Sequence, residues 1–262
     1  MRALSIAATG MLAQQTNVEV IANNLANMNT TGYKAQRAAF QDLLYQNIQQ
    51  AGAQSSDTGT LLPSGIQLGA GVRTAAVYRI TKPGDMKNTS NPYDVAINGA
   101  GYFRVQMPDG TDGYSRDGNF QLSAEGQLVT QQGYVVQPGI AIPPTSTSVT
   151  INTQGQVQVT LPGQVALQTV GQLELTRFPN DAGLRALGDN LYAETSASGG
   201  PQAGVPGSTG YGTIQQYFLE TSNVDAVSEI TSLISAQRAY EMNSKVVSTS
   251  DQMLAETAKL GA

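Results

Sequence analysis

Both ends of this 262-residue chain carry the same seven-residue apolar repeat, which constrains the fold more than any other feature of the sequence. The first repeat runs through Leu4, Met11, Val18 and Leu25. The second runs through Leu233, Tyr240, Val247 and Leu254. Apolar residues seven apart on a helix form a narrow seam that packs against another helix, as in coiled coils. We therefore expect an N-terminal helix over about residues 4–25 and a C-terminal helix ending near residue 260, paired with each other.

A single pair of such helices is not expected to be stable by itself. Fixing the backbone of one residue costs about 1–2 kcal/mol, and helices in proteins are stabilised mainly by packing of their apolar face. One narrow seam offers little packing for so much ordered backbone. The helices are thus expected to order fully only among helices of neighbouring molecules, which indicates a polymer subunit.

The composition argues against several classes of function. Acidic residues outnumber basic ones, 19 to 14, whereas nucleic-acid binders and proteins of anionic membrane surfaces need a basic surface. The chain has no cysteine and no histidine, so it lacks thiolate ligands and the commonest catalytic base. We predict no catalytic, cofactor-binding or metal-binding residues, and no enzymatic activity. The amphipathic N-terminal segment predicts neither a cleaved signal peptide nor membrane insertion.

The segment after the first helix is expected to contain a shorter helix and then an extended arm. Apolar residues recur at helical spacing through residues 33–48, where Phe40 precedes Leu44 by one turn. Residues 49–71 are rich in Gln, Ser, Gly and Thr, with Leu61, Leu62 and Ile66 among the scattered apolar residues. These apolar side chains need a surface to rest on. We expect the arm to lie on a neighbouring subunit, with a solvated linker as the alternative.

The central sequence predicts a hairpin-rich antiparallel β domain. Short runs of Val, Ile, Tyr and Thr alternate with glycine turns from residue 72 to about 171, with one more strand at 172–178, a loop at 196–212 and a last strand at 215–219. Ser222, with Asp225 three residues on, is the expected cap of the C-terminal helix.

The predicted fold class is α+β, with coiled-coil-like terminal helices and a central all-β domain. Three parts are expected: residues 1–36 with 220–262 as the terminal helical domain, 37–75 as the helix and arm with an insert at about 46–65, and 76–219 as the β domain.

Two glycine-containing patterns resemble ligand sites but favour turns. Asp109, Asp112 and Asp117 lack the spacing and the terminal glutamate of a calcium loop. Two Gly-Ala-Gly triplets, at 69–71 and 99–101, do not open a helix after a strand, as a phosphate-binding loop would.

Polar residues of the two predicted helices are better candidates for function. Asn23, Asn24 and Asn27 lower the helix propensity of the first helix, and Gln237 lies in the seam row of the second. An exposed polar face is the simpler interpretation. We favour hydrogen bonds across helix interfaces that fix the register of packing, as polar residues do in coiled coils. Together with the eight heptad residues, these four are the predicted subunit interface.

Several motifs resemble those of the bacterial flagellar rod and hook family. The helical ends carry Ala22-Asn23-Asn24-Leu25-Ala26-Asn27, Thr31-Gly32-Tyr33-Lys34, Ser222-Asn223-Val224-Asp225 and Gln237-Arg238-Ala239-Tyr240-Glu241. The segments 95–103 and 114–120 are similar to the β domain of that family. The resemblance spans the whole chain. In its length, its single β domain and its insert, the chain resembles the distal rod member of the family. The hook and proximal rod subunits are the alternatives.

This resemblance implies a structural subunit of a helical tube, with the terminal helices lining the inner wall and the β domain outside. The tube would span the periplasm to the outer membrane as a drive shaft of the basal body and carry an export channel. The implied partners are further copies of the chain, proximal rod proteins below, hook protein above, the P and L rings, the rod cap and the flagellar type III export gate. No nucleic acid or cofactor is implied.

The resemblance also implies export without a cleaved signal. Phe40 and Leu44 match the export-gate motif of rod and hook substrates, but they would also pack as an ordinary helix pair. Two rival classes are a β-rich periplasmic hydrolase and a surface adhesin. The lack of histidine, cysteine and paired carboxylates disfavours the hydrolase, and only the rod interpretation requires tubes.

Overall fold

The computed structural model describes residues 2–50, 64–163 and 166–260, and the chain divides into two compact units. The terminal unit comprises Met1–Leu25, Gln36–Tyr78 and Asp225–Ala262. The β unit comprises Ala26–Ala35 and Arg79–Val224. The N-terminal and C-terminal segments thus belong to one unit although most of the chain separates them in sequence.

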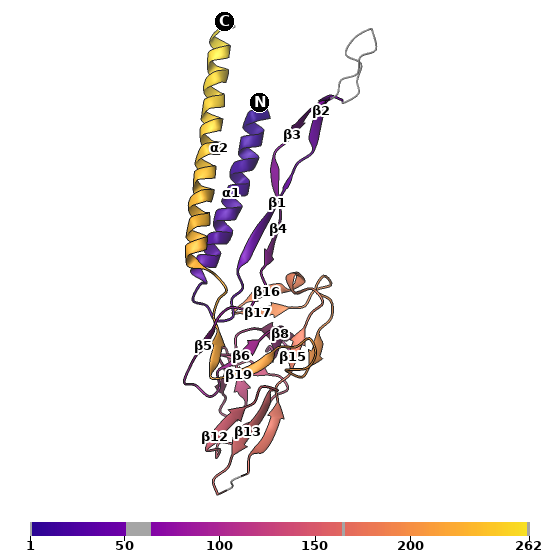
Figure 1. Cartoon of the computed structure of the whole chain (residues 1–262), viewed down its shortest axis with the longest axis vertical. Helices are drawn as coiled ribbons and strands as arrows, with labels where there is room; N and C mark the ends of the chain where they lie inside the picture. The colour runs from indigo at the N-terminus through magenta and orange to yellow at the C-terminus, as the bar shows by residue number, and fades with distance from the viewer. Residues whose placement is uncertain (1, 51–63, 164–165, 261–262) are drawn as a thin grey trace. The chain divides into compact units, whose positions relative to one another are not determined.

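The terminal unit contains both predicted long helices. Helix α1 spans Arg2–Ala26 and helix α2 spans Ala226–Leu260, and Figure 1 shows them side by side. Both helices are confirmed, as is the α+β class. The expected turn after α1 is also present, since Gly32 has a φ of +67°, a conformation that glycine adopts without strain.

The cap of α2 differs from the predicted one. Asp225 accepts hydrogen bonds from the backbone N–H groups of Val227 and Ser228, at 2.9 and 3.3 Å. Ser222 instead accepts a bond from the N–H of Val224, before the helix begins. The prediction of Ser222 as cap was wrong by three residues, because a serine and an aspartate can both accept from the free N–H groups of a first turn.

The predicted helix at residues 33–48 is absent, and strands take its place. Strand β1 (Gln36–Asp42) pairs with β4 (Val72–Arg79), and β2 (Tyr45–Gln49) pairs antiparallel with β3 (Ile66–Gly69). Backbone bonds between the two pairs, from Leu43 to Gly71 and from Ala70 to Leu44, join them into one ribbon (Figure 1). The helical spacing was misleading because the partner strand that satisfies the backbone groups lies about thirty residues away in the chain.

The β unit contains the remaining strands and one short 3₁₀ helix, η1 (Asp181–Gly183). The strands are β5 (Met86–Asn88), β6 (Val95–Asn98), β7 (Tyr102–Gln106), β8 (Asp112–Ser115), β9 (Gln121–Leu122), β10 (Leu128–Val129), β11 (Val135–Val136), β12 (Ser148–Ile151), β13 (Gln156–Thr160), β14 (Gln168–Gln172), β15 (Leu175–Arg177), β16 (Arg185–Gly188), β17 (Leu191–Ala193), β18 (Gln202–Gly204), β19 (Thr213–Gln216) and β20 (Phe218–Glu220).

Local hairpins and long-range pairings both build the β unit. The largest sheet has the order β16-β17-β8-β7-β11-β10-β9, with β15 also paired to β7 and to β18, and β12-β13-β14 form a second sheet. The hairpins β7–β8 and β12–β13 confirm the predicted glycine turns between them. The turn at Asn98-Gly99 closes no hairpin, because β6 pairs with β19 instead.

The end of the β unit also differs from the sequence-based expectation. The strand predicted at 215–219 is interrupted at Tyr217, whose φ of +67° breaks the extended backbone. Its two parts, β19 and β20, pair with β6 and β5 respectively. Strand β18 lies inside the stretch predicted as loop, where glycines and prolines obscured it.

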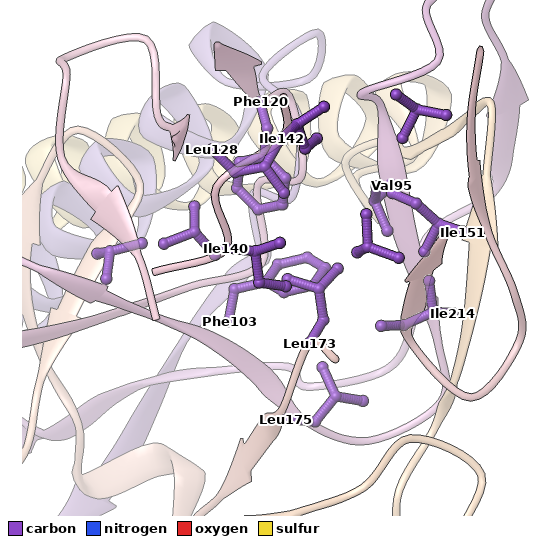
Figure 2. Packing of buried hydrophobic residues seen from close by; sticks show 14 of the residues in the cluster. Val95, Phe103, Phe120, Leu128, Ile140, Ile142, Ile151, Leu173, Leu175 and Ile214 are labelled. Carbon is purple, nitrogen blue, oxygen red and sulfur yellow. The ribbon is translucent and has the colours of Figure 1, made fainter. Parts of the chain in front are cut away.

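One large apolar core holds the β unit together. Phe103 on β7 and Phe120 have no exposed surface, and their rings meet edge to face with centroids 5.0 Å apart. Figure 2 shows these rings among aliphatic side chains that come from several strands, including Val95, Leu128, Ile151 and Ile214. The long-range pair β6–β19 supplies Ile97 and Ile214 to the same core.

Candidate functional site

Apart from Asn24, the predicted interface residues of α1 and α2 are not the most buried residues of the two helices. Leu4, Met11, Val18 and Leu25 are half-buried, as are Leu233 and Val247. Tyr240 and Leu254 are each 44 % exposed. The most buried positions on the helices are Ala7, Ala13, Val20, Ile21, Asn24, Ala236 and Ser250.

The two helices come close to each other at Gly10 of α1. A Cβ atom built on Gly10 of α1 would lie 2.9 Å from the side-chain nitrogen of Asn243 on α2, which is too close for a real side chain. Further along, the helices enclose a groove of about 520 Å³ between them. Val18, Gln237 and Tyr240, three of the predicted interface residues, line this groove together.

Among the three predicted interface asparagines, Asn24 is the one whose contacts the structure defines best. Its side-chain oxygen accepts a hydrogen bond from the N–H of Gln36, and its side-chain nitrogen donates to the carbonyl oxygen of Gln36, each at 2.8 Å. The same nitrogen donates to Glu229 of α2 at 3.2 Å. Asn24 is 1 % exposed, and its hydrogen bonds join α1, β1 and α2 within one chain. Partial burial raises the pKa of Glu229, against the lowering effect of this bond.

The other two predicted interface asparagines, Asn23 and Asn27, are placed differently. Asn23 is exposed on α1, and Asn27 follows the helix, where its side-chain oxygen accepts a hydrogen bond from the Thr30 hydroxyl at 3.1 Å. The spacing in the sequence did not distinguish Asn24 from its neighbours, because all three belong to the same short polar run.

Helix α2 carries several apolar side chains that the described residues of the chain leave exposed. Val227 is 75 % exposed, Met242 64 % and Met253 56 %, with further exposed apolar residues at Ile230, Ile234 and Val246. Single exposed apolar residues are normal, but this many on one helix indicate a surface that another molecule covers.

The β ribbon of the terminal unit is exposed in the same way. Leu44, between β1 and β2, is 88 % exposed, and Ile66 on β3 is 48 % exposed. Strands β2 and β3 contain no charged residue, although charges are the usual protection of an exposed edge strand. Leu61 and Leu62, predicted to act with Ile66, lie outside the described residues.

Phe40 and Leu44 do not form a helix pair. Phe40 lies on β1 and is 37 % exposed, while Leu44 follows that strand. The packing explanation of this pair, which required a helix, is therefore wrong.

A buried cluster of three charged residues lies in the β unit and was not predicted. The Glu220 carboxylate has no exposed surface and accepts a hydrogen bond from Lys34 Nζ at 2.5 Å and from Arg116 Nε at 2.9 Å. Arg116 Nη2 is 2.9 Å from the same carboxylate oxygen but lacks hydrogen-bond geometry. Arg116 Nη1 donates to the carbonyl oxygens of Gly99 and Gly101, at 2.8 and 2.7 Å. One of the two Gly-Ala-Gly triplets thus anchors this arginine.

The charges of the cluster perturb one another in a consistent way. Burial acts to raise the pKa of Glu220, but the attraction of Arg116 and Lys34 outweighs burial and lowers it below the ordinary value. Burial, and then repulsion by Arg116, lowers the pKa of Lys34. Two cations share one carboxylate, so the charged form of Glu220 is stabilised by both of them, whereas the charged form of Lys34 is stabilised by Glu220 and opposed by Arg116. Pairing of the Glu220 carboxylate therefore stabilises the fold at pH values above the ordinary glutamate pKa. This stabilisation is lost as the pH falls through the lowered pKa of Glu220 in the folded chain.

Two kinds of site are missing from the described part of the chain. Across residues 2–50, 64–163 and 166–260, no three acidic side chains gather in a way that could hold a metal ion. Within the same ranges, neither helix combines the length and continuous apolarity needed to cross a lipid bilayer.

Exposed apolar helix and ribbon surfaces, supported by buried polar contacts, define this chain as a structural subunit of an assembly. Comparison with known proteins gives the family. The flagella basal body rod protein family matches residues 4–34, the D1 domain of the flagellar hook protein FlgE/F/G matches 96–159, and the C-terminal domain of the flagellar basal body rod FlgEFG proteins matches 215–260.

Full-length relatives agree with these matches. The chain is 57 % identical to the flagellar basal-body rod protein FlgG of Caulobacter vibrioides over 99 % of each chain. It is 51 % identical to FlgG of Agrobacterium fabrum over 99 % of each chain, and 38 % identical to FlgG of Bacillus subtilis over the same share. The chain belongs to the flagellar basal-body rod and hook family, whose members are structural proteins and not enzymes. The family inferred from the sequence motifs is thereby confirmed.

Proposed function

We propose that this chain is the distal rod subunit of the flagellar basal body, which polymerises into a helical tube that transmits torque and encloses an export channel. The observation that carries the proposal is the number of exposed apolar side chains along α2, in a chain that belongs to the rod family. Further copies of the same chain cover these side chains. Contacts between different surfaces of identical subunits do not close on themselves and generate helical filaments.

The distal position rests on a comparison within one organism. Against the proteins of Caulobacter vibrioides, the chain is 57 % identical to FlgG but 36 % identical to the rod protein FlgF. The sequence resemblance to the distal rod member points the same way. A proximal rod or hook subunit is the alternative assignment.

The position proposed here determines the partners. Proximal rod proteins lie below the distal rod, hook protein lies above it, and the P and L rings surround it between the periplasm and the outer membrane. The rod cap and the flagellar type III export gate act during assembly. The predicted interface residues on α1 and α2 contact neighbouring subunits in the tube.

The ribbon and its insert are proposed to stiffen the tube. Ile66 and Leu68 on β3 are 48 % and 46 % exposed, and β2 opposite them is exposed throughout. An isolated two-stranded ribbon is at best marginally stable in water, so the ribbon gains by lying on a neighbouring subunit. Each apolar side chain buried there contributes about 1.5–3 kcal/mol and opposes sliding between subunits.

Deleting residues 46–65 tests the rod function and the role of the ribbon together. The wild-type protein at high concentration is expected to form straight tubes in negative-stain electron micrographs. The deletion variant is expected to form tubes that are curved or flexible, because the α1 and α2 surfaces are untouched. Absence of tubes from the wild-type protein would contradict the rod function. Straight tubes of unchanged stiffness from the variant would show that the segment is only a linker.

Phe40 is proposed to take part in export. Its exposure on β1, and the absence of the helix that would have given it a packing partner at Leu44, support a recognition role. Phe40→Ala is expected to reduce secreted subunit several-fold in a strain that lacks the rod cap, as measured by immunoblot of culture medium. Tyr45→Ala, which removes another exposed aromatic side chain nearby, is the control and should leave secretion unchanged. Equal secretion of Phe40→Ala and wild type would exclude the motif.

A further inference from the structure

The chain passes between its two units at four points. On the side of the β unit, these four points lie at the ends of three short segments. Residues 26–35 begin and end at such points, residue 79 follows the third, and residue 224 precedes the fourth. Any force that reaches the β unit through the backbone therefore enters it through residues 26–35, the start of 79–85, or the end of 220–224, called here the entry segments.

Glu220 contacts the other two entry segments from its own. Its backbone carbonyl accepts a hydrogen bond from the N–H of Gly32 at 2.8 Å, and its carboxylate accepts one from Lys34. The same carboxylate accepts a bond from the N–H of Gly84 at 3.0 Å. Its second oxygen pairs with Arg116, which is anchored to the carbonyl groups just before β7.

Asn223 joins the same three segments without any charge. Its side-chain oxygen accepts a hydrogen bond from the N–H of Ala35 at 2.7 Å. Its side-chain nitrogen donates to the carbonyl oxygens of Ile80 and Lys82, at 2.9 and 2.8 Å. Ile80 and Ala35 are also bonded directly through their backbones at 2.8 Å. The entry segments are thus tied to each other twice.

Stability alone does not account for a buried cluster of this kind. Replacing a buried ion pair with apolar residues of similar volume is often neutral or stabilising, because desolvation of the charges offsets their attraction. Apolar packing has no preferred direction, whereas a carboxylate that accepts bonds from three directions fixes the positions of its donors. Compared with apolar packing, the cluster therefore adds fixed positions for the entry segments that it joins.

We propose that Glu220 is a positioning residue that locks the three entry segments to one another and, through Arg116, to the largest sheet of the β unit. The mechanical consequence rests on the proposed rod function, since torque then passes from the backbone into the sheet without bending of these segments. The locking itself is a property of one subunit and is tested on the isolated full-length chain.

Glu220→Gln is the principal variant, because it keeps the shape of the side chain but removes the charge. Hydrogen exchange is measured on the amides of Gly32, Ala35, Ile80 and Gly84, and on core amides such as Phe103 and Leu128. The ratio of entry-segment to core exchange rates is expected to rise at least tenfold. A variant that only lowered global stability would raise both rates together, and an unchanged ratio would overturn the proposal.

Two further variants separate positioning from charge balance. Lys34→Met in the Glu220→Gln background removes one unpaired cation, so the melting temperature should recover in part while the exchange ratio stays high. Recovery of the ratio as well would mean that the cluster serves charge balance only, which overturns the proposal. Asp112→Asn makes the same chemical change in the exposed pair with Arg104, where the side chains are 42 % and 37 % exposed, and should change neither quantity.

Asn223→Ala covers the case in which Glu220→Gln does not fold. This variant removes the bonds to Ala35, Ile80 and Lys82 without exposing a buried charge, and it should raise the exchange ratio by itself. An Asn223→Ala protein with wild-type exchange at Ala35 and Ile80 would contradict the proposal. If that protein shows the local loss but wild-type tubes remain absent, the locking stands and the proposed rod function fails.

Discussion

Leu254→Asp is expected to abolish tube formation while leaving the melting of the β unit unchanged. Leu254 lies on α2 and is 44 % exposed in the single chain, so the new carboxylate stays hydrated in the unassembled subunit. In the proposed tube the same position is buried against neighbouring helices. The variant then loses about 1.5–3 kcal/mol of apolar burial per subunit and must also desolvate an unpaired charge.

The measurement combines thermal melting of the soluble subunit with negative-stain microscopy at a concentration at which the wild-type protein forms tubes. Ser248→Asp is the matched control, because it adds the same carboxylate at an exposed polar position of α2 without removing an apolar side chain. Normal tubes from Leu254→Asp would exclude this position from the subunit interface. Loss of tubes from Ser248→Asp as well would mean that any added charge on α2 blocks assembly.

Phe103→Ala is expected to lower the free energy of unfolding of the β unit by about 3–5 kcal/mol. Phe103 has no exposed surface and packs edge to face on Phe120 at the centre of the core in Figure 2. Removing the ring leaves a cavity in the core. Strands of local hairpins and strands of long-range pairs both surround this cavity. Loss of that much stability is a large share of the 5–15 kcal/mol typical of a folded protein.

Urea unfolding followed by tyrosine fluorescence measures this change. Phe40→Ala is the control, because it makes the same substitution at a position that is 37 % exposed on β1, and it should cost about 0.5 kcal/mol or less. A loss below about 1 kcal/mol for Phe103→Ala would mean that the core collapses around the missing ring.

The helices and the family could both be predicted from the sequence, and each for a local reason. A heptad repeat reports on one face of one helix, so α1 and α2 were found almost to their ends. Glycine turns such as Asp109-Gly110 lie between strands that pair directly, so the β7–β8 hairpin followed from a few adjacent residues. The family motifs are contiguous short runs and need no knowledge of the fold.

The largest error and the main omission involve partners that are distant in the chain. Residues 36–49 form strands because β3 and β4 complete their backbone hydrogen bonds, and nothing within the run indicates this. Lys34 and Arg116 lie within motifs of the family, at residues 31–34 and 114–120. Their shared partner Glu220 is 186 residues from Lys34 and 104 residues from Arg116. A glutamate at the end of a short apolar strand was the available signal, since a charge there is buried only if it is paired.

Local periodicity decides whether a segment can be a helix or a strand, because the residues that set it are neighbours in the chain. Tertiary structure alone decides which charge is buried and which asparagine forms a bond. Asn24 became the contact between α1, β1 and α2 because the fold brings Gln36 and Glu229 to it. The free energy of burying a polar group depends on partners that only the folded chain assembles.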